Sequence, residues 1–254
     1  MKECLKLQED IGLDVLVHGE FLGTFILILL GNGVVSGVVL NKTKATGAGW
    51  VAITLGWGFA VMMGVYISGF MSPAHLNPAV TIAMAMIGSF SWSLVLPYII
   101  AQMLGAMVAS IILYLMFYPH YAETKNPADI LGTFSTGPAI RQTSSNLISE
   151  IVGTAVLTTG ILAFGQYAIT QTSGVSPLLV GAIITAIGLS LGATTGYSLN
   201  PARDLGPRIM HAILPIKGKG DSDWSYAWIP VVGPIIGGSL GALLFNMVIQ
   251  FASK

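Results

Sequence analysis

Two apolar stretches of this chain each contain the tripeptide Asn-Pro-Ala, and this feature limits the possible folds most. The copies are Asn77-Pro78-Ala79 and Asn200-Pro201-Ala202, and each follows a leucine. Asparagine caps the free N–H groups at the start of a helix, and proline at the first helical position gives up no hydrogen bond. Each copy therefore predicts a helix start. A helix start at membrane depth requires a protein-lined or water-filled cavity around it.

The chain has too few charged residues for a soluble domain. Only 9% of its 254 residues are charged, against about 25% in soluble domains, and 54% are hydrophobic. This composition predicts a multi-span helical membrane protein. The net charge is zero and no basic tract is present, which argues against nucleic acid as a partner. The single cysteine, Cys4, excludes an intrachain disulfide, and we expect no metal site and no cofactor.

Six apolar runs are long enough to cross a bilayer, which takes about 20 residues. They cover residues 12–39, 49–70, 93–118, 148–168, 177–197 and 226–251. We expect the first run to be retained as a spanning helix rather than removed as part of a signal peptide. The longest polar connection, residues 119–146, divides the chain near its middle and predicts a loop outside the bilayer.

The two halves of the chain resemble each other. The segment that begins at Glu20 (Glu-Phe-Leu-Gly-Thr) corresponds to the segment that begins at Glu150 (Glu-Ile-Val-Gly-Thr), and one Asn-Pro-Ala follows in each half. Three spans per half is an odd number, so the second half would enter the membrane from the opposite face, as inverted repeats do. We expect a single membrane domain over residues 1–254, made of inverted repeats 11–118 and 147–252 joined by loop 119–146.

The two segments that begin with Asn-Pro-Ala, Asn77–Gly88 and Asn200–Ala212, are too short to span a bilayer. We interpret them as re-entrant half-helices that meet at the midplane. The alternative is a capped helix in an ordinary interhelical loop, but two copies in register in an inverted repeat favour a pore. The predicted fold is an all-α membrane protein with six transmembrane helices and two re-entrant half-helices.

Several polar residues in these stretches are functional candidates. Arg203 lies at the positive N-terminal end of its half-helix, where a cation is unfavourable, and its counterpart in the first half is Val80. The alternative is an interfacial arginine paired with Asp204 or Asp221. Asp204 suits the helix N-terminus and is expected to help hold the loop.

Two carboxylates within the apolar runs also allow two interpretations. Glu20 and Glu150 could form a proton relay, or they could accept hydrogen bonds from unpaired N–H groups of the re-entrant loops, which we favour. His75 is expected to belong to the same support, near Glu20. The other histidines, His18, His120 and His211, are expected at surfaces or interfaces.

These motifs resemble those of the major intrinsic protein family, the aquaporins and glycerol facilitators. The resemblance rests on His75–Thr81, on Gly196–Asp204 and on the duplicated Glu-bearing helices. It implies six tilted helices and two half-helices around one pore per subunit, usually with four subunits together. Two helix N-termini at the midplane would repel protons and other cations, while the amides of Asn77 and Asn200 would donate hydrogen bonds to a passing hydroxyl.

The resemblance also implies a constriction formed by Trp57, Gly188, Tyr197 and Arg203. Water-selective relatives usually have Phe, His and a small residue in the first three places, whereas glycerol-conducting relatives resemble Trp, Gly and an aromatic residue. Gly188 would widen the passage, and the two aromatic rings would form an apolar corner for a carbon backbone. Many bacterial glycerol facilitators have Phe in the place of Tyr197. Without the comparison to the family motifs, Trp57 could be an ordinary core aromatic residue, and Gly188 could be a glycine that lets two helices pack closely.

The implied function is passive conduction of glycerol, other small uncharged solutes and water, with exclusion of protons and ions. Urea, dihydroxyacetone, hydrogen peroxide and protonated lactic acid are further candidate solutes. A homotetramer in the lipid bilayer of the plasma membrane, with cytoplasmic termini, is also expected from the resemblance. We expect no enzymatic activity, because the chain lacks a credible nucleophile–base pair or metal site. The alternatives are a water-selective aquaporin and a small secondary transporter.

Overall fold

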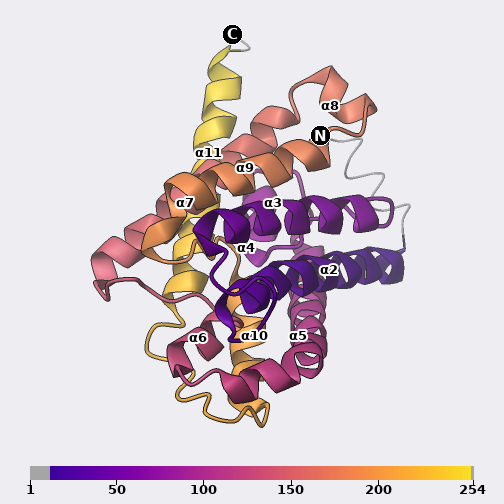
Figure 1. Cartoon of the computed structure of the whole chain (residues 1–254). Helices are drawn as coiled ribbons and strands as arrows, with labels where there is room; N and C mark the ends of the chain where they lie inside the picture. Colours follow the sequence, from indigo (N-terminus) through magenta and orange to yellow (C-terminus); the bar gives the residue numbers. More distant parts are fainter. Residues whose placement is uncertain (1–11, 253–254) are drawn as a thin grey trace.

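The computed structural model describes residues 12–252 as a bundle of helices (Figure 1). The expectations about Cys4, about residue 11 at the start of the first repeat and about the two chain ends concern residues outside this range. Within these described residues, five helices are long and apolar enough to cross a membrane. They are α2 (Leu13–Val39), α3 (Gly49–Ser68), α5 (Trp92–Glu123), α7 (Thr143–Phe164) and α11 (Ile229–Ala252).

Shorter helices complete the described part of the chain. α9 (Ser176–Ser190) is apolar, and α4 (Pro78–Met86) and α10 (Pro201–Ile213) are the two predicted half-helices. Pro78 and Pro201 occupy the first helical positions, and the alanines that follow them are fully buried. The remaining elements are α6 (Pro127–Gly132), α8 (Ala168–Thr172) and the 3₁₀ helix η1 (Gly192–Thr194).

The predicted span 177–197 is wrong at its C-terminal end. α9 has only 15 residues, which is about 22 Å at 1.5 Å per residue and shorter than a hydrocarbon core of about 30 Å. After Ser190 the chain turns through η1 and through Gly196 and Tyr197, which have positive φ. Hydropathy misses this boundary because the turning segment, residues 191–197, contains no charged residue.

The predicted loop 119–146 is too long at both ends, since α5 continues to Glu123 and α7 already begins at Thr143. The last turn of α5 is held by packing that a single sequence does not reveal. Tyr121 is buried against Phe134, and the hydroxyl groups of Tyr121 and Thr133 are 3.0 Å apart.

Asn-Pro-Ala also occurs a third time, inside this polar connection, at Asn126-Pro127-Ala128. This third copy starts α6 and caps it in the same way, because Asn126 Oδ1 accepts from Ala128 N at 3.1 Å. Asn126 and Ala128 are exposed. The tripeptide by itself therefore specifies only a capped helix start.

Glycines allow the long helices to pack closely in both halves. A Cβ atom at Gly105 of α5 would lie 2.4 Å from the Phe21 carbonyl oxygen of α2, and one at Gly237 of α11 would lie 2.1 Å from the Ile151 carbonyl oxygen of α7. Such contacts bring helix backbones together where lipid provides no hydrophobic driving force. Figure 1 shows α2 running beside α3, and α11 passing next to α7.

The half-helices link the two halves of the bundle. α4 packs mainly against α11, and α10 packs mainly against α5, so each half-helix lies against the last long helix of the opposite half. Large apolar side chains such as Leu96, Leu115 and Met247 point outward from the long helices, which suits a surface in contact with lipid tails. The fold is that of a multi-pass helical membrane protein.

Candidate functional site

The two half-helices meet at their N-termini through their asparagines. Each side-chain oxygen caps its own helix by accepting from the backbone N–H two residues on, at 2.9 Å for Asn77 and 3.0 Å for Asn200. The amide nitrogens join the two loops, because Asn77 donates to the Leu199 carbonyl and Asn200 to the Leu76 carbonyl, both at 2.8 Å. Each amide nitrogen has a second N–H that these bonds do not use.

Glu20 holds the loop that leads to α4. Its carboxylate accepts from Ser72 Oγ and His75 N at 2.9 Å each, from Leu76 N at 2.7 Å and from Gln102 Nε2 at 2.7 Å. Glu20 is fully buried. His75 takes part through its backbone N–H, so Glu20 satisfies two backbone donors that would otherwise be unpaired inside the protein.

Glu150 holds the loop that leads to α10 in the same way. It accepts from Thr195 Oγ1 at 2.7 Å and from the backbone N–H groups of Ser198 and Leu199 at 3.0 Å each. The three donors stand five, two and one residues before the capping asparagine, as they do around Glu20. The same arrangement, a buried carboxylate that accepts from three donors just before the capping asparagine, therefore occurs in both halves.

These carboxylates stabilise a strained backbone that the sequence did not signal. Ala74 and Leu76 have φ values of 52° and 52°, and their counterparts Tyr197 and Leu199 have values of 38° and 54°. Residues other than glycine rarely adopt this left-handed conformation, which costs about 1 kcal/mol or more at each position. Such conformations persist where surrounding contacts determine them, as the hydrogen bonds of Glu20 and Glu150 do here.

Arg203 projects from the first turn of α10 toward Trp57 and α2. Its Nη1 donates to Asn32 Oδ1 and to the Phe134 carbonyl at 3.2 Å each, and its guanidinium carbon lies 4.2 Å from the Trp57 ring centroid. Asn32 also donates to the Phe134 carbonyl, at 3.1 Å. The alternative that Arg203 pairs with Asp204 or Asp221 is wrong, because its polar partners are neutral oxygens.

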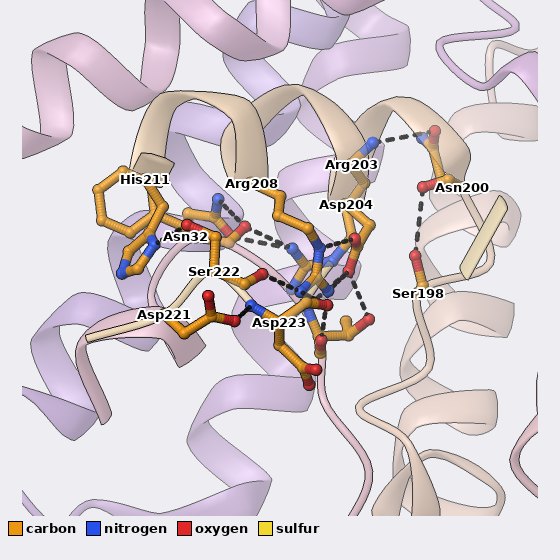
Figure 2. Close-up of polar contacts among 12 residues, drawn as sticks. Asn32, Ser198, Asn200, Arg203, Asp204, Arg208, His211, Asp221, Ser222 and Asp223 are labelled. Carbon is orange, nitrogen blue, oxygen red and sulfur yellow. Dashed lines mark hydrogen bonds and ion pairs between the residues drawn. The ribbon is translucent and has the colours of Figure 1, made fainter. Parts of the chain in front are cut away.

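Asp204 pairs instead with Arg208, one turn further along α10 (Figure 2). Arg208 Nε lies 2.8 Å from Asp204 Oδ1, and both side chains are fully buried. Asp204 Oδ2 also accepts from the backbone N–H and the hydroxyl of Thr136, at 2.7 Å each. Arg208 donates to the carbonyls of Thr136 and Ser222. This ion pair therefore fastens the loops before α7 and before α11 to the second half-helix.

The expectation that His211 lies at a surface or interface is wrong. His211 is fully buried, and its Nδ1 lies 2.8 Å from Ser222 Oγ, so it belongs to the same polar cluster behind α10 (Figure 2).

Two cavities meet at the predicted constriction. The larger, of about 340 Å³, is lined by both capping asparagines and by mostly apolar residues of α3, α7 and α9. The smaller, of about 230 Å³, lies beside α6 and the N-terminal part of α3. Trp57, Tyr197 and Arg203 line both cavities, so these three predicted residues stand between them.

Gly188, the fourth predicted constriction residue, lines neither cavity. A Cβ atom there would lie 2.7 Å from Tyr197 Cζ and 2.8 Å from its hydroxyl oxygen. The expectation that Gly188 itself widens the passage is therefore incomplete, because the space that it leaves is filled by the ring of Tyr197.

Sequence reasoning missed several residues that build this site. Asn32 and Phe134 accept hydrogen bonds from Arg203, and Thr136 donates hydrogen bonds to Asp204. Trp50 contacts Gly188 and Tyr197. The sequence could have indicated Asn32 as a functional candidate, because it is a polar residue in the middle of an apolar span. The others lie in segments whose position in space the sequence does not show.

The chain matches known proteins over nearly its whole length. The family model described as Major intrinsic protein matches residues 15–245. "Glycerol uptake facilitator protein 3" of Lactiplantibacillus plantarum is 60% identical over 250 residues, which cover 98% of this chain and 99% of that protein. "Glycerol uptake facilitator protein" of Streptococcus pneumoniae is 62% identical over 231 residues, which cover 91% of this chain and 98% of that protein.

A solved structure shares the fold. The X-ray structure of the aquaglyceroporin from Plasmodium falciparum superposes with a TM-score of 0.83 at 32% sequence identity, covering 95% of this chain and 98% of the other. Together with the paired half-helices, these matches establish that the chain belongs to the major intrinsic protein family.

Proposed function

We propose that this protein is a passive channel that conducts glycerol, other small uncharged solutes and water, and excludes protons and ions. The observation that carries the proposal is the junction of two cavities at Trp57, Tyr197 and Arg203. The relatives described above, which bear the name glycerol uptake facilitator, support glycerol as the main solute.

The constriction offers complementary surfaces to a polyol. Trp57 and Tyr197 present aromatic rings to a carbon backbone. Among the described residues, hydrogen bonds of the Arg203 side chain come only from Nη1, which leaves Nε and Nη2 free to donate to solute hydroxyls. A neutral solute with hydroxyls along one side matches both surfaces, whereas a cation meets the charge of Arg203.

Proton exclusion follows from the meeting of α4 and α10. Their N-termini carry partial positive charge, and the remaining N–H of each capping asparagine can donate to a passing oxygen. An oxygen that accepts from Asn77 and Asn200 directs its own hydrogens away from both, so a continuous proton-conducting chain of water is interrupted.

Other residues support this pore by holding the loops that form it. Glu20, Glu150 and the backbone of His75 hold the re-entrant loops, and Asp204 holds the loop before α7. The same proposal includes inverted repeats 11–118 and 147–252 joined by the connection 119–146, a homotetramer in the plasma membrane, cytoplasmic termini and no enzymatic activity. Urea, dihydroxyacetone, hydrogen peroxide and protonated lactic acid are further proposed solutes.

Stopped-flow light scattering on proteoliposomes under a glycerol gradient tests the function. We expect glycerol permeability well above that of empty liposomes, linear in the gradient and independent of proton or sodium gradients. Fast water flux with glycerol flux at the level of empty liposomes would identify a water-selective channel instead. Saturable uptake driven by an ion gradient would identify a secondary transporter.

A further inference from the structure

The ring of Tyr197 lies on a surface made of glycine backbone. A Cβ atom at Gly188 would be 2.7 Å from Tyr197 Cζ, and one at Gly192 would be 2.4 Å from Tyr197 Cδ1. These glycines are one helical turn apart, so no side chain from either position supports or orients the ring. The ring also lines both cavities, so any change in its tilt changes the passage between them.

The polar group of Tyr197 does not fix the ring either. Its hydroxyl is buried and has no hydrogen-bond partner among the described residues. The backbone of Tyr197 is in the left-handed region, with φ of 38°. The orientation of the ring therefore depends on the side chains packed against it.

Trp50, at the start of α3, contacts both the ring and the surface beneath it. Its indole packs edge-to-face on Tyr197, with ring centroids 5.7 Å apart and an interplanar angle of 77°. Its Nε1 donates to the Gly188 carbonyl at 2.9 Å, which joins α3 to α9. Trp50 is half-buried and also lines the smaller cavity.

We propose that Trp50 is a positioning residue that sets the width of the constriction, by holding the Tyr197 ring and the Gly188 backbone in place. This inference rests on the proposed function, and it adds a residue that determines the size limit for uncharged solutes. Trp50 acts through Tyr197, so its removal lets the ring tilt into the space that the indole leaves. The constriction then widens, and the permeability to larger polyols increases more than the permeability to glycerol.

The test compares permeabilities to water, glycerol and the four-carbon polyol erythritol in proteoliposomes. The readout is the erythritol-to-glycerol ratio, which does not depend on how much channel has folded. We expect Trp50→Ala to raise this ratio about threefold to tenfold, the size of effect that an edge-to-face aromatic contact produces. Trp50→Phe keeps a ring and loses the N–H donor, so its ratio should rise less, by about twofold to threefold.

Two comparisons separate positioning from general packing. Trp92→Phe changes an exposed tryptophan at the start of α5 that lines neither cavity, and it should leave the ratio at the wild-type value. In a Tyr197→Ala background there is no ring to position, so adding Trp50→Ala should change the ratio by less than about twofold.

An unchanged ratio in Trp50→Ala would overturn the inference, as would an equal effect of Trp50→Ala with and without the Tyr197 ring. Failure of the proposed function gives a different result, because wild-type protein would then show no polyol flux above that of empty liposomes. In that case the inference would fall together with the function on which it rests.

Discussion

The two half-helices begin alike and then diverge. α4 and α10 share the asparagine cap, the proline at the first position and a carboxylate that holds the preceding loop. Counting from the asparagine, the third, fourth and eighth following positions are Val80, Thr81 and Ala85 in α4, but Arg203, Asp204 and Arg208 in α10. The shared part builds a symmetric junction, and the unshared part builds the charged constriction and its attachment to the loops.

The difference indicates how the proposed inverted repeat can form an asymmetric pore. Two identical half-helices would provide proton exclusion at their junction but the same surface on either side. An arginine in only one copy places a single charge at the proposed constriction, and the buried Asp204–Arg208 pair attaches that half-helix to the loop before α7. The predictions below test which features depend on the symmetric part and which depend on α10 alone.

The largest effect is expected for the ion pair that only α10 has. Asp204→Ala leaves Arg208 buried without a counter-charge and frees the Thr136 donors, so the free energy of unfolding should fall by about 3–5 kcal/mol. Thermal unfolding in detergent measures this. Arg141→Ala breaks the more exposed pair with Asp223 and should cost less than about 1 kcal/mol. Equal losses would show that burial does not distinguish the two pairs.

The next effect concerns the symmetric carboxylates. Glu20→Gln and Glu150→Gln each replace one hydrogen-bond-accepting carboxyl oxygen by an amide NH₂ group, so each should lower the free energy of unfolding by about 1–3 kcal/mol. Glu20→Gln should cost somewhat more, because Glu20 also accepts from Gln102. Thermal unfolding of both variants measures the difference. A large loss in one half and none in the other would contradict the common local design.

A smaller effect is expected when α10 is made like α4 at the constriction. Arg203→Val introduces the residue found at position 80 and removes the positive charge, so proton leak should rise at least about tenfold. A pH-sensitive dye trapped in proteoliposomes reports the leak. Arg203→Lys keeps the charge and should stay near the wild-type value. A leak that is the same in all three proteins would place the barrier at the asparagine junction alone.

The smallest effect concerns Tyr197, whose counterpart in the first half is Ala74. Tyr197→Phe removes a buried hydroxyl that has no hydrogen-bond partner within residues 12–252, so the free energy of unfolding should rise by about 1 kcal/mol. Tyr121→Phe is the matched control: that hydroxyl lies 3.0 Å from Thr133 Oγ1, and its loss should cost about 1 kcal/mol. Destabilisation by Tyr197→Phe in a thermal melt would mean that the hydroxyl has a partner.

Local patterns predicted the cap at Asn77 and Asn200, the five longest helices and the support by Glu20 and Glu150. These features depend on composition, on hydropathy and on residues close in sequence. The patterns failed at the end of α9 and at both ends of the connection 119–146, where buried aromatic and loop residues decide the boundaries. They also placed His211 at the surface, because a single sequence does not show which loop covers it.

The third Asn-Pro-Ala, at Asn126, shows what the tripeptide alone does not predict. It caps α6 with the same hydrogen bond as the two pore copies. Yet it lies in an exposed connection, whereas Asn77 and Asn200 are buried and each bonds the loop of the other. The tripeptide determines the start of a helix, and its surroundings determine whether that start becomes part of a pore.

The sequence by itself determined the membrane class, the paired half-helices, the family and the three residues Trp57, Tyr197 and Arg203 that line both cavities. Those properties follow from apolar length, helix capping and residues that the family motifs locate. Only the tertiary structure decided that Arg203 binds neutral oxygens from α2 and the loop before α7, and that Tyr197 fills the space above Gly188 beside Trp50. These contacts join segments far apart in the chain, so their geometry depends on how the two halves pack.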